Sequence, residues 1–171
     1  MKFKLHYLGL IIAVIFFYQL VNASLSGNYV SSLLLCFPAI YFIFSLLVRK
    51  KLSFKGFFTS RFNIFTTKEF RVVNYDIPRS QLFQNIIKNL ENSDFKLIDI
   101  DKDVFELLAI SEISFKSWGE NIYLSFEENK ENEEHTTLKF CSTTFCGIID
   151  WGKNEENYNQ LLTQIAKSSV V

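Results

Sequence analysis

The first 68 residues contain no aspartate or glutamate, although they carry eight of the eighteen lysines and arginines. All eighteen acidic residues therefore fall after position 68, where ten basic residues accompany them. The formal net charge of zero thus hides a basic first part and an acidic second part. Such asymmetry indicates that the two parts meet different surroundings. An acidic second part also argues against nucleic acid as a partner, because phosphates would be repelled.

The sequence also lacks the short motifs that carry well-defined chemistry. It has no P-loop, no dinucleotide-binding glycine pattern, no nucleophile elbow and no HExxH zinc motif. Its three cysteines, Cys36, Cys141 and Cys146, have no second Cys or His pair beside them that would predict a metal site. We therefore expect a protein that is not an enzyme and holds neither a metal nor a cofactor.

Two long runs have no charged residue at all, Leu5 to Val21 and Val30 to Val48. Each is long enough to cross a hydrocarbon core of roughly 30 Å as a helix. Lysines precede the first run and "RKKLSFK" follows the second, which places both flanks on the cytoplasmic side. We expect a transmembrane hairpin over residues 1–48, with spans at about 5–21 and 30–48, in a multi-pass bacterial inner-membrane protein. The alternative is that the first run is a cleaved signal peptide.

Residues 49–68 alternate cations with phenylalanines, a pattern typical of a segment at a membrane surface. Here the cations would face anionic lipid and the rings would settle among the headgroups. The residues expected to contact membrane lipids are Arg49, Lys50, Lys51, Lys55, Phe57 and Phe58.

Residues 69–171 predict one soluble α+β domain on the cytoplasmic side. The segments 70–75, 95–101, 104–115, 121–128 and 136–145 have strand character, and an amphipathic helix follows the first of them. A last helix places Tyr158, Leu161, Leu162 and Ile165 on one face. The order strand, helix, four strands, helix predicts an antiparallel sheet of about five strands with two helices packed on one face.

Two short turns place a tryptophan before a glycine, "SWGE" at 117–120 and "DWGKN" at 150–154. Both follow predicted strands, so Trp118 and Trp151 can meet at one end of the sheet and line a shallow pocket. Most residues of "DWGKN" also fit an ordinary junction between a strand and a helix, with Gly152 in the turn and Asn154 as a helix cap. We keep Trp118, Trp151, Asp150 and Asn154 as the candidate binding surface.

The stretch "CSTTFCGIIDWGKN" resembles the C-terminal pattern of an uncharacterised family of bacterial proteins, Ser-x-Ser/Thr-x-x-Gly-x-x-Asp-x-Gly-x-Asn. The matching residues are Ser142, Thr144, Gly147, Asp150, Gly152 and Asn154. The chain departs from the pattern at Cys141, where that family has an arginine. The resemblance implies a shared fold rather than a reaction, because the family has no assigned activity.

These observations favour a membrane-anchored binding or assembly module that holds membrane lipids through its anchor and a protein partner through its domain. A first alternative is that the soluble domain binds a lipid or another apolar ligand near the tryptophans. A second is an immunity-type protein that neutralises a basic toxin with its acidic face. The sequence does not define an oligomeric state.

Overall fold

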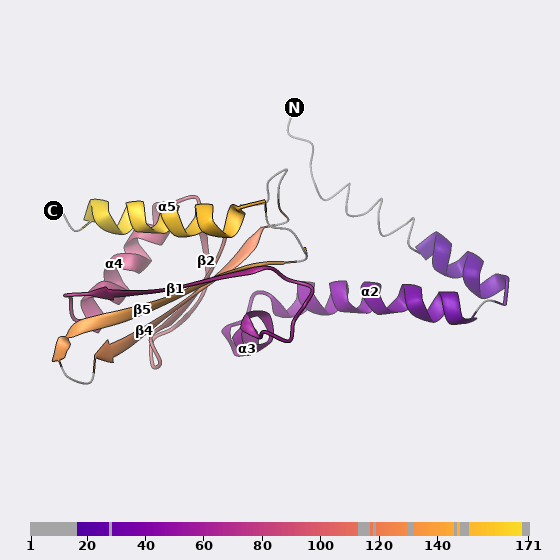
Figure 1. The fold of residues 1–171 in the computed structure, drawn as a ribbon, viewed down its shortest axis with the longest axis horizontal. Helices are drawn as coiled ribbons and strands as arrows, with labels where there is room; N and C mark the ends of the chain where they lie inside the picture. Colours follow the sequence, from indigo (N-terminus) through magenta and orange to yellow (C-terminus); the bar gives the residue numbers. More distant parts are fainter. Residues whose placement is uncertain are drawn as a thin grey trace, which may run out of the picture. The chain divides into compact units, whose positions relative to one another are not determined.

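The chain divides into two compact units, Met1–Leu47 and Val48–Val171, in a computed structural model that describes residues 17–27, 29–112, 117, 119–129, 132–145, 147 and 151–168. In the first unit, residues 17–25 are helical, and helix α2 covers Tyr29–Val48, so that its last residue already belongs to the second unit (Figure 1). All strands found among the described residues, and the helices that cover them, belong to the second unit.

The expected transmembrane hairpin and the inner-membrane location are wrong. Among the described residues, no helix combines the length and the apolar character that a membrane crossing requires. Most of the first expected span lies outside the described residues, since the description begins at position 17. At the other end, Val48 does not continue an apolar span but is buried in the core of the second unit.

The second unit is built on a five-stranded antiparallel sheet in the order β1-β5-β4-β3-β2. Its strands are β1 Lys68–Tyr75, β2 Lys96–Asp101, β3 Glu106–Ile110, β4 Glu120–Asn129 and β5 Asn132–Thr144. Helix α4, Arg79–Glu91, follows β1, and helix α5, Lys153–Ser168, follows β5. The first strand therefore lies beside the last, and the predicted α+β class and antiparallel sheet agree with the structure (Figure 1).

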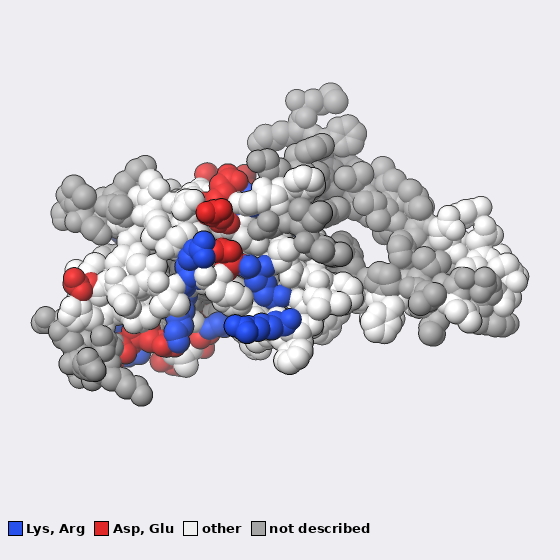
Figure 2. Space-filling model, in the orientation of Figure 1, with Lys and Arg blue, Asp and Glu red and all other residues white. Residues whose placement is uncertain are grey.

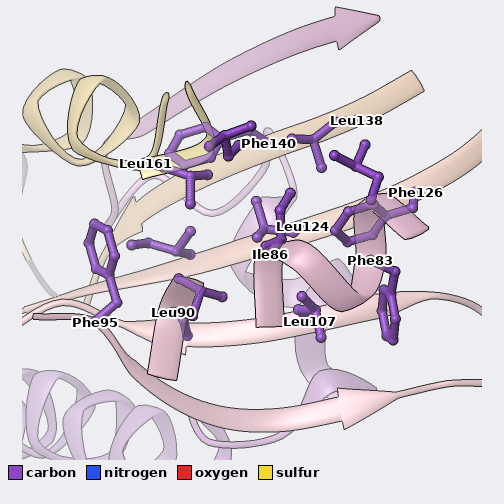
Figure 3. Packing of buried hydrophobic residues seen from close by; sticks show 14 residues of the cluster. Phe83, Ile86, Leu90, Phe95, Leu107, Leu124, Phe126, Leu138, Phe140 and Leu161 are labelled. Carbon is purple, nitrogen blue, oxygen red and sulfur yellow. The ribbon is translucent and has the colours of Figure 1, made fainter. Parts of the chain in front are cut away.

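The main core lies between the sheet and helices α4 and α5. Figure 3 shows Phe83, Ile86 and Leu90 of α4 directed toward apolar side chains of the sheet. Those sheet residues alternate along their strands, because successive side chains of a strand point to opposite faces. They are Leu107 and Ala109 of β3, Ile122, Leu124 and Phe126 of β4, and Leu138 and Phe140 of β5.

The opposite face of the sheet is covered as well, by the segment that precedes β1. This segment forms a short 3-10 helix, η1 Leu52–Phe54, and helix α3, Lys55–Thr59. Phe58 of α3 is fully buried against Tyr123, with the two rings stacked 6.5 Å apart, in a cluster that also holds Val48, Leu108 and Cys141. The sheet is thus packed on both faces, and the second face is closed by residues that precede the first strand.

Polar contacts fix the same segment to the sheet. The Leu52 amide donates to Asp99 Oδ2 at 3.0 Å, and Lys55 Nζ lies 2.6 Å from Glu106 Oε1. The domain therefore begins at Val48 rather than at residue 69, because residues 48–59 supply part of its core.

Candidate functional site

A group of buried polar side chains lies at one end of the sheet, where β3 ends, β4 begins and α5 begins. We define this buried polar cluster as Ser111, Ser117, Glu120, Ser142, Asn154 and Asn157. Apart from Ser117, which is half-buried, these side chains are almost completely removed from solvent. Buried polar groups require hydrogen-bond partners, so the arrangement of this cluster is tightly constrained.

Glu120 is the centre of the cluster and is fully buried. Its Oε2 accepts hydrogen bonds from the Ser111 hydroxyl and, at 3.1 Å, from Asn157 Nδ2, while its Oε1 accepts one from the Ser117 hydroxyl. The Glu120 amide in turn donates to Ser111 Oγ at 2.8 Å. Three donors on one carboxylate offset much of the cost of burying a charge.

The other half of the cluster joins α5 to the sheet. Ser142 Oγ donates to Asn154 Oδ1 at 2.7 Å and accepts from Asn157 Nδ2 at 3.3 Å. Asn154 Nδ2 reaches Thr67 Oγ1 at 3.4 Å, just before β1. Asn157 Oδ1 is the one buried acceptor of the described cluster without a hydrogen-bond partner. The first turn of α5 is therefore held by side-chain bonds to β4, β5 and the start of β1.

Several residues of the sequence pattern discussed above meet at this junction. Besides the Ser142 to Asn154 bond, the Thr144 hydroxyl donates to the Gly147 carbonyl at 3.1 Å and accepts from the Thr67 amide at 3.0 Å. Of these bonds, the one between Ser142 and Asn154 connects the last strand to the last helix, and those of Thr144 connect the end of the last strand to Gly147 and to Thr67.

Arg49 lies on the other side of the same sheet end and is 7 % exposed. Its Nε donates to Asn121 Oδ1 at 3.2 Å, and its guanidinium carbon lies 4.5 Å from the centre of the Phe145 ring. Burial lowers the pKa of Arg49, while the nearby Tyr123 and Glu120 act in the opposite direction. Expected as a membrane-surface cation, Arg49 is instead packed inside the domain.

A set of strongly exposed apolar side chains lies in the segments on either side of the Thr66–Gly147 bridge. We call it the apolar rim and define it as Phe62, Ile64 and Trp151, whose exposed fractions are 95 %, 74 % and 69 %. Phe62 and Ile64 precede Thr66, which forms a parallel β-bridge with Gly147, and Trp151 follows Gly147 along the chain. Trp151 has φ +50°, a backbone conformation that residues other than glycine rarely adopt.

The structure places the predicted site residues in different environments. Asn154 is buried in the cluster and Trp151 is exposed on the rim, whereas Trp118 and Asp150 lie outside the described residues. Of the expected membrane contacts, Phe58 is buried and Lys55 pairs with Glu106, while Lys50 and Lys51 are exposed and Phe57 is packed in the second cluster. Phe58 and Arg49 are thus not available to a membrane surface.

Sequence reasoning missed the role of Glu120. No short motif marks this carboxylate, because two of its partners lie 9 residues away at Ser111 and 37 residues away at Asn157. The sequence feature that could have identified Glu120 is its position directly after Gly119. This glycine adopts the positive φ of +89° that the turn requires.

Other chemistry-bearing groups do not gather here. Burial raises the pKa of the Cys141 thiol to about 12, so this thiol is a poor nucleophile at neutral pH. His135 pairs with Asp76 at 2.6 Å on the surface. Within the described part of the chain, no three His, Cys, Asp or Glu side chains come together as a metal site would need.

The charge of the second unit is nearly balanced. Counting from Val48, it contains sixteen basic and eighteen acidic residues, because the basic segment belongs to it. Figure 2 shows acidic and basic side chains next to one another on the visible face of this unit. The idea of an acidic face that neutralises a basic toxin therefore has little basis in the charge distribution.

Neither a protein-family model nor any of the curated proteins matches this sequence, so the family resemblance stays a prediction from its motif alone. Among solved structures, the one titled "Crystal structure of Ara h 8.0201" is similar, with a TM-score of 0.48 and 7 % sequence identity. The match covers 62 % of this chain and 99 % of that chain.

Proposed function

We propose that the second unit binds an apolar small molecule, such as a fatty acid, at the apolar rim. The observation that carries this proposal is Trp151, which exposes 69 % of its surface from a left-handed backbone conformation. A residue other than glycine in that conformation costs about 1–2 kcal/mol, and strain of this kind is typical of ligand sites.

The buried polar cluster supports the proposal because it fixes the base of the rim. Asn154, three residues after Trp151, is tied to Ser142 and Thr67, and Gly147 donates its amide to the Phe65 carbonyl at 3.0 Å. The start of α5, next to Trp151, is thus fixed, which reduces the entropy that ligand binding at the indole would otherwise cost. An exposed tryptophan and phenylalanine supply large apolar contact area.

Fluorescence titration tests the proposal, with oleate and with 1-anilinonaphthalene-8-sulfonate as probes. The variants Trp151→Gly and Phe62→Ala are expected to weaken binding by about tenfold or more, since each removes roughly 1.5–3 kcal/mol of apolar contact. Val104→Ala is the matched control, because Val104 is 58 % exposed in the turn between β2 and β3. Equal affinity in all four proteins would refute the proposal.

Trp151→Gly also separates binding from folding. Glycine adopts positive φ without steric cost, so the variant is expected to melt at or slightly above the temperature of the unaltered chain while losing the ligand. A large drop in melting temperature would instead identify Trp151 as a structural residue. Solvent extraction of the purified protein followed by mass spectrometry gives an independent check, because a bound lipid should be recovered in stoichiometric amount.

A further inference from the structure

The two edges of the sheet differ in how they are protected against pairing with another strand. Edge strand β2 has a register shift between Leu97 and Asp99, and carries acidic residues at Asp99 and Asp101. Bulges and charges of one sign are common devices against edge-to-edge association. Edge strand β1 has eight residues in unbroken register with β5, and Phe70 and Val72 are 51 % and 64 % exposed. The β1 edge has no register shift, and its charged residues, Lys68, Glu69 and Arg71, are of both signs.

The outward backbone groups of β1 can be assigned from its pairing; one of them, the Phe70 carbonyl, accepts a 3.5 Å hydrogen bond from Arg71 Nη1 in the single chain. Thr144 N donates to the Thr67 carbonyl at 3.0 Å, so Thr67 faces β5. Backbone groups alternate in direction along an antiparallel strand, which turns those of Lys68, Phe70, Val72 and Asn74 away from β5. These are the groups that a further strand would pair with.

On β1, Lys68 has no charged counterpart at Val72, but two opposite charges are placed symmetrically about Phe70. Glu69 and Arg71 flank it on the other face of the strand and form an ion pair with each other. Arg71 also lies over the Tyr158 ring, at 5.6 Å, on the face covered by α5. When such a strand meets its own copy in antiparallel register centred on Phe70, each Glu69 lies opposite an Arg71, and the two Phe70 side chains are neighbours.

We infer that two copies of this chain associate through β1, antiparallel and in register at Phe70. The inference does not depend on the proposed ligand, because the apolar rim and the β1 edge are formed by different residues. Neighbouring registers are less favourable: centring on Arg71 would oppose two arginines, and centring on Val72 would leave both charged residues without an opposite charge. Of these three registers, only the one centred on Phe70 places each Glu69 opposite an Arg71 and also keeps the outward backbone groups of the two strands opposite one another.

Charge exchange tests the interface and its register on the full chain. Sedimentation equilibrium is expected to show a dimer for the unaltered protein. Glu69→Arg and Arg71→Glu should each weaken it by about tenfold or more, since like charges then lie opposite each other twice. Mixing the two variants, or combining both substitutions in one chain, should restore the dimer. Glu127→Lys is the matched control, since Glu127 pairs with Lys139 away from this edge, and should leave the dimer intact.

A cysteine at the symmetry point gives a second test that does not rely on charge. Hydrogen-bonded antiparallel pairs have Cα atoms about 5.5 Å apart, which lies within the range that a disulfide spans. In a chain that also carries Cys36→Ser, Cys141→Ala and Cys146→Ser, Phe70→Cys should form a covalent dimer on oxidation, whereas Val72→Cys should not; Cys141 is replaced because it lies opposite position 70 on β5.

Several outcomes would overturn the inference. These are a monomeric unaltered chain at millimolar concentration, a dimer that both single charge variants retain, and a mixture or double exchange that fails to re-form it. Equal cross-linking through positions 70 and 72 would refute the register. Circular dichroism of each variant establishes that it is folded, and the double exchange preserves the ion pair within the chain. Loss of ligand binding with an intact dimer, or the reverse, separates this inference from the proposed function.

Discussion

Cys141 illustrates how one buried group responds to its surroundings. Its side chain lies in the second core cluster, on the face covered by α3, and is 6 % exposed. Burial raises the pKa of its thiol to about 12 from an ordinary value of 9.0, although the positive charge of Lys68 acts in the opposite direction. The folded protein therefore keeps this proton at pH values where the unfolded chain loses it.

We predict that the free energy of unfolding falls above pH 9 in a manner that depends on Cys141. Between the unfolded pKa near 9 and the folded pKa near 12, the folded state binds more protons, so stability decreases as pH rises, by up to about 1.4 kcal/mol per pH unit from this group. Urea unfolding from pH 8 to 10 measures the slope. Cys141→Ala should show a smaller pH dependence; identical slopes would contradict the assignment.

At the scale of elements, α5 depends on a few polar bonds as well as on apolar packing. Leu161 and Ile165 bury its apolar face, but its first turn is fixed by Asn154 and Asn157. Both asparagines bond to Ser142, which therefore joins the last helix to the central part of the sheet.

We predict that Ser142→Ala loosens the start of α5. The substitution removes the Ser142 hydrogen bond to Asn154 Oδ1 and one acceptor of Asn157 Nδ2, at a cost of about 1–3 kcal/mol for hydrogen bonds lost by buried groups. Amide exchange in residues 154–158 should accelerate, together with a lower melting temperature. Thr163→Ala is the control, because that exposed hydroxyl bonds only within α5 and its loss should cost less than about 0.5 kcal/mol. Unchanged exchange in Ser142→Ala would count against the anchoring role.

Periodicity predicted the elements of the sheet domain because each depends on neighbouring residues. The alternation of Ile122, Leu124 and Phe126 identifies a strand wherever its partner lies. The second face was not predicted, since Tyr123 and Cys141 alternate with the inward residues and nothing near them in sequence identifies α3 as their cover. The cations and phenylalanines from Arg49 onward are equally compatible with packing on a sheet and with contact to lipid, so their composition could not distinguish the two. The polar cluster was missed because its bonds join residues far apart in sequence.

At the scale of the whole molecule, the domain boundary moves from residue 69 to residue 48. Residues 48–59 contribute Val48 and Phe58 to a cluster that would otherwise expose Leu108 and Tyr123. Each large apolar side chain contributes about 1.5–3 kcal/mol when buried, and small domains are stable by only about 5–15 kcal/mol. The short segment before β1 therefore supplies a substantial share of the stability.

We predict that a fragment of residues 48–171 folds and melts cooperatively, whereas a fragment of residues 69–171 does not. The longer fragment retains both core clusters, and the shorter one loses the cover of the second face. Thermal melts followed by near-ultraviolet circular dichroism compare the two. Equal melting temperatures would mean that residues 48–68 add nothing to the fold.

The pairing of the first strand with the last has a consequence for biosynthesis. β1 is made about 60 to 75 residues before the part of β5 that it pairs with. At a translation rate of about 5–20 residues per second, β1, with Phe70 and Val72, remains without its partner strand for roughly 3–15 s. Phe58, whose cover comes from Tyr123 and Cys141, waits as well. Completion of this sheet is therefore a late event on the ribosome, and a chain stalled before residue 132 presents an apolar strand to nascent-chain chaperones.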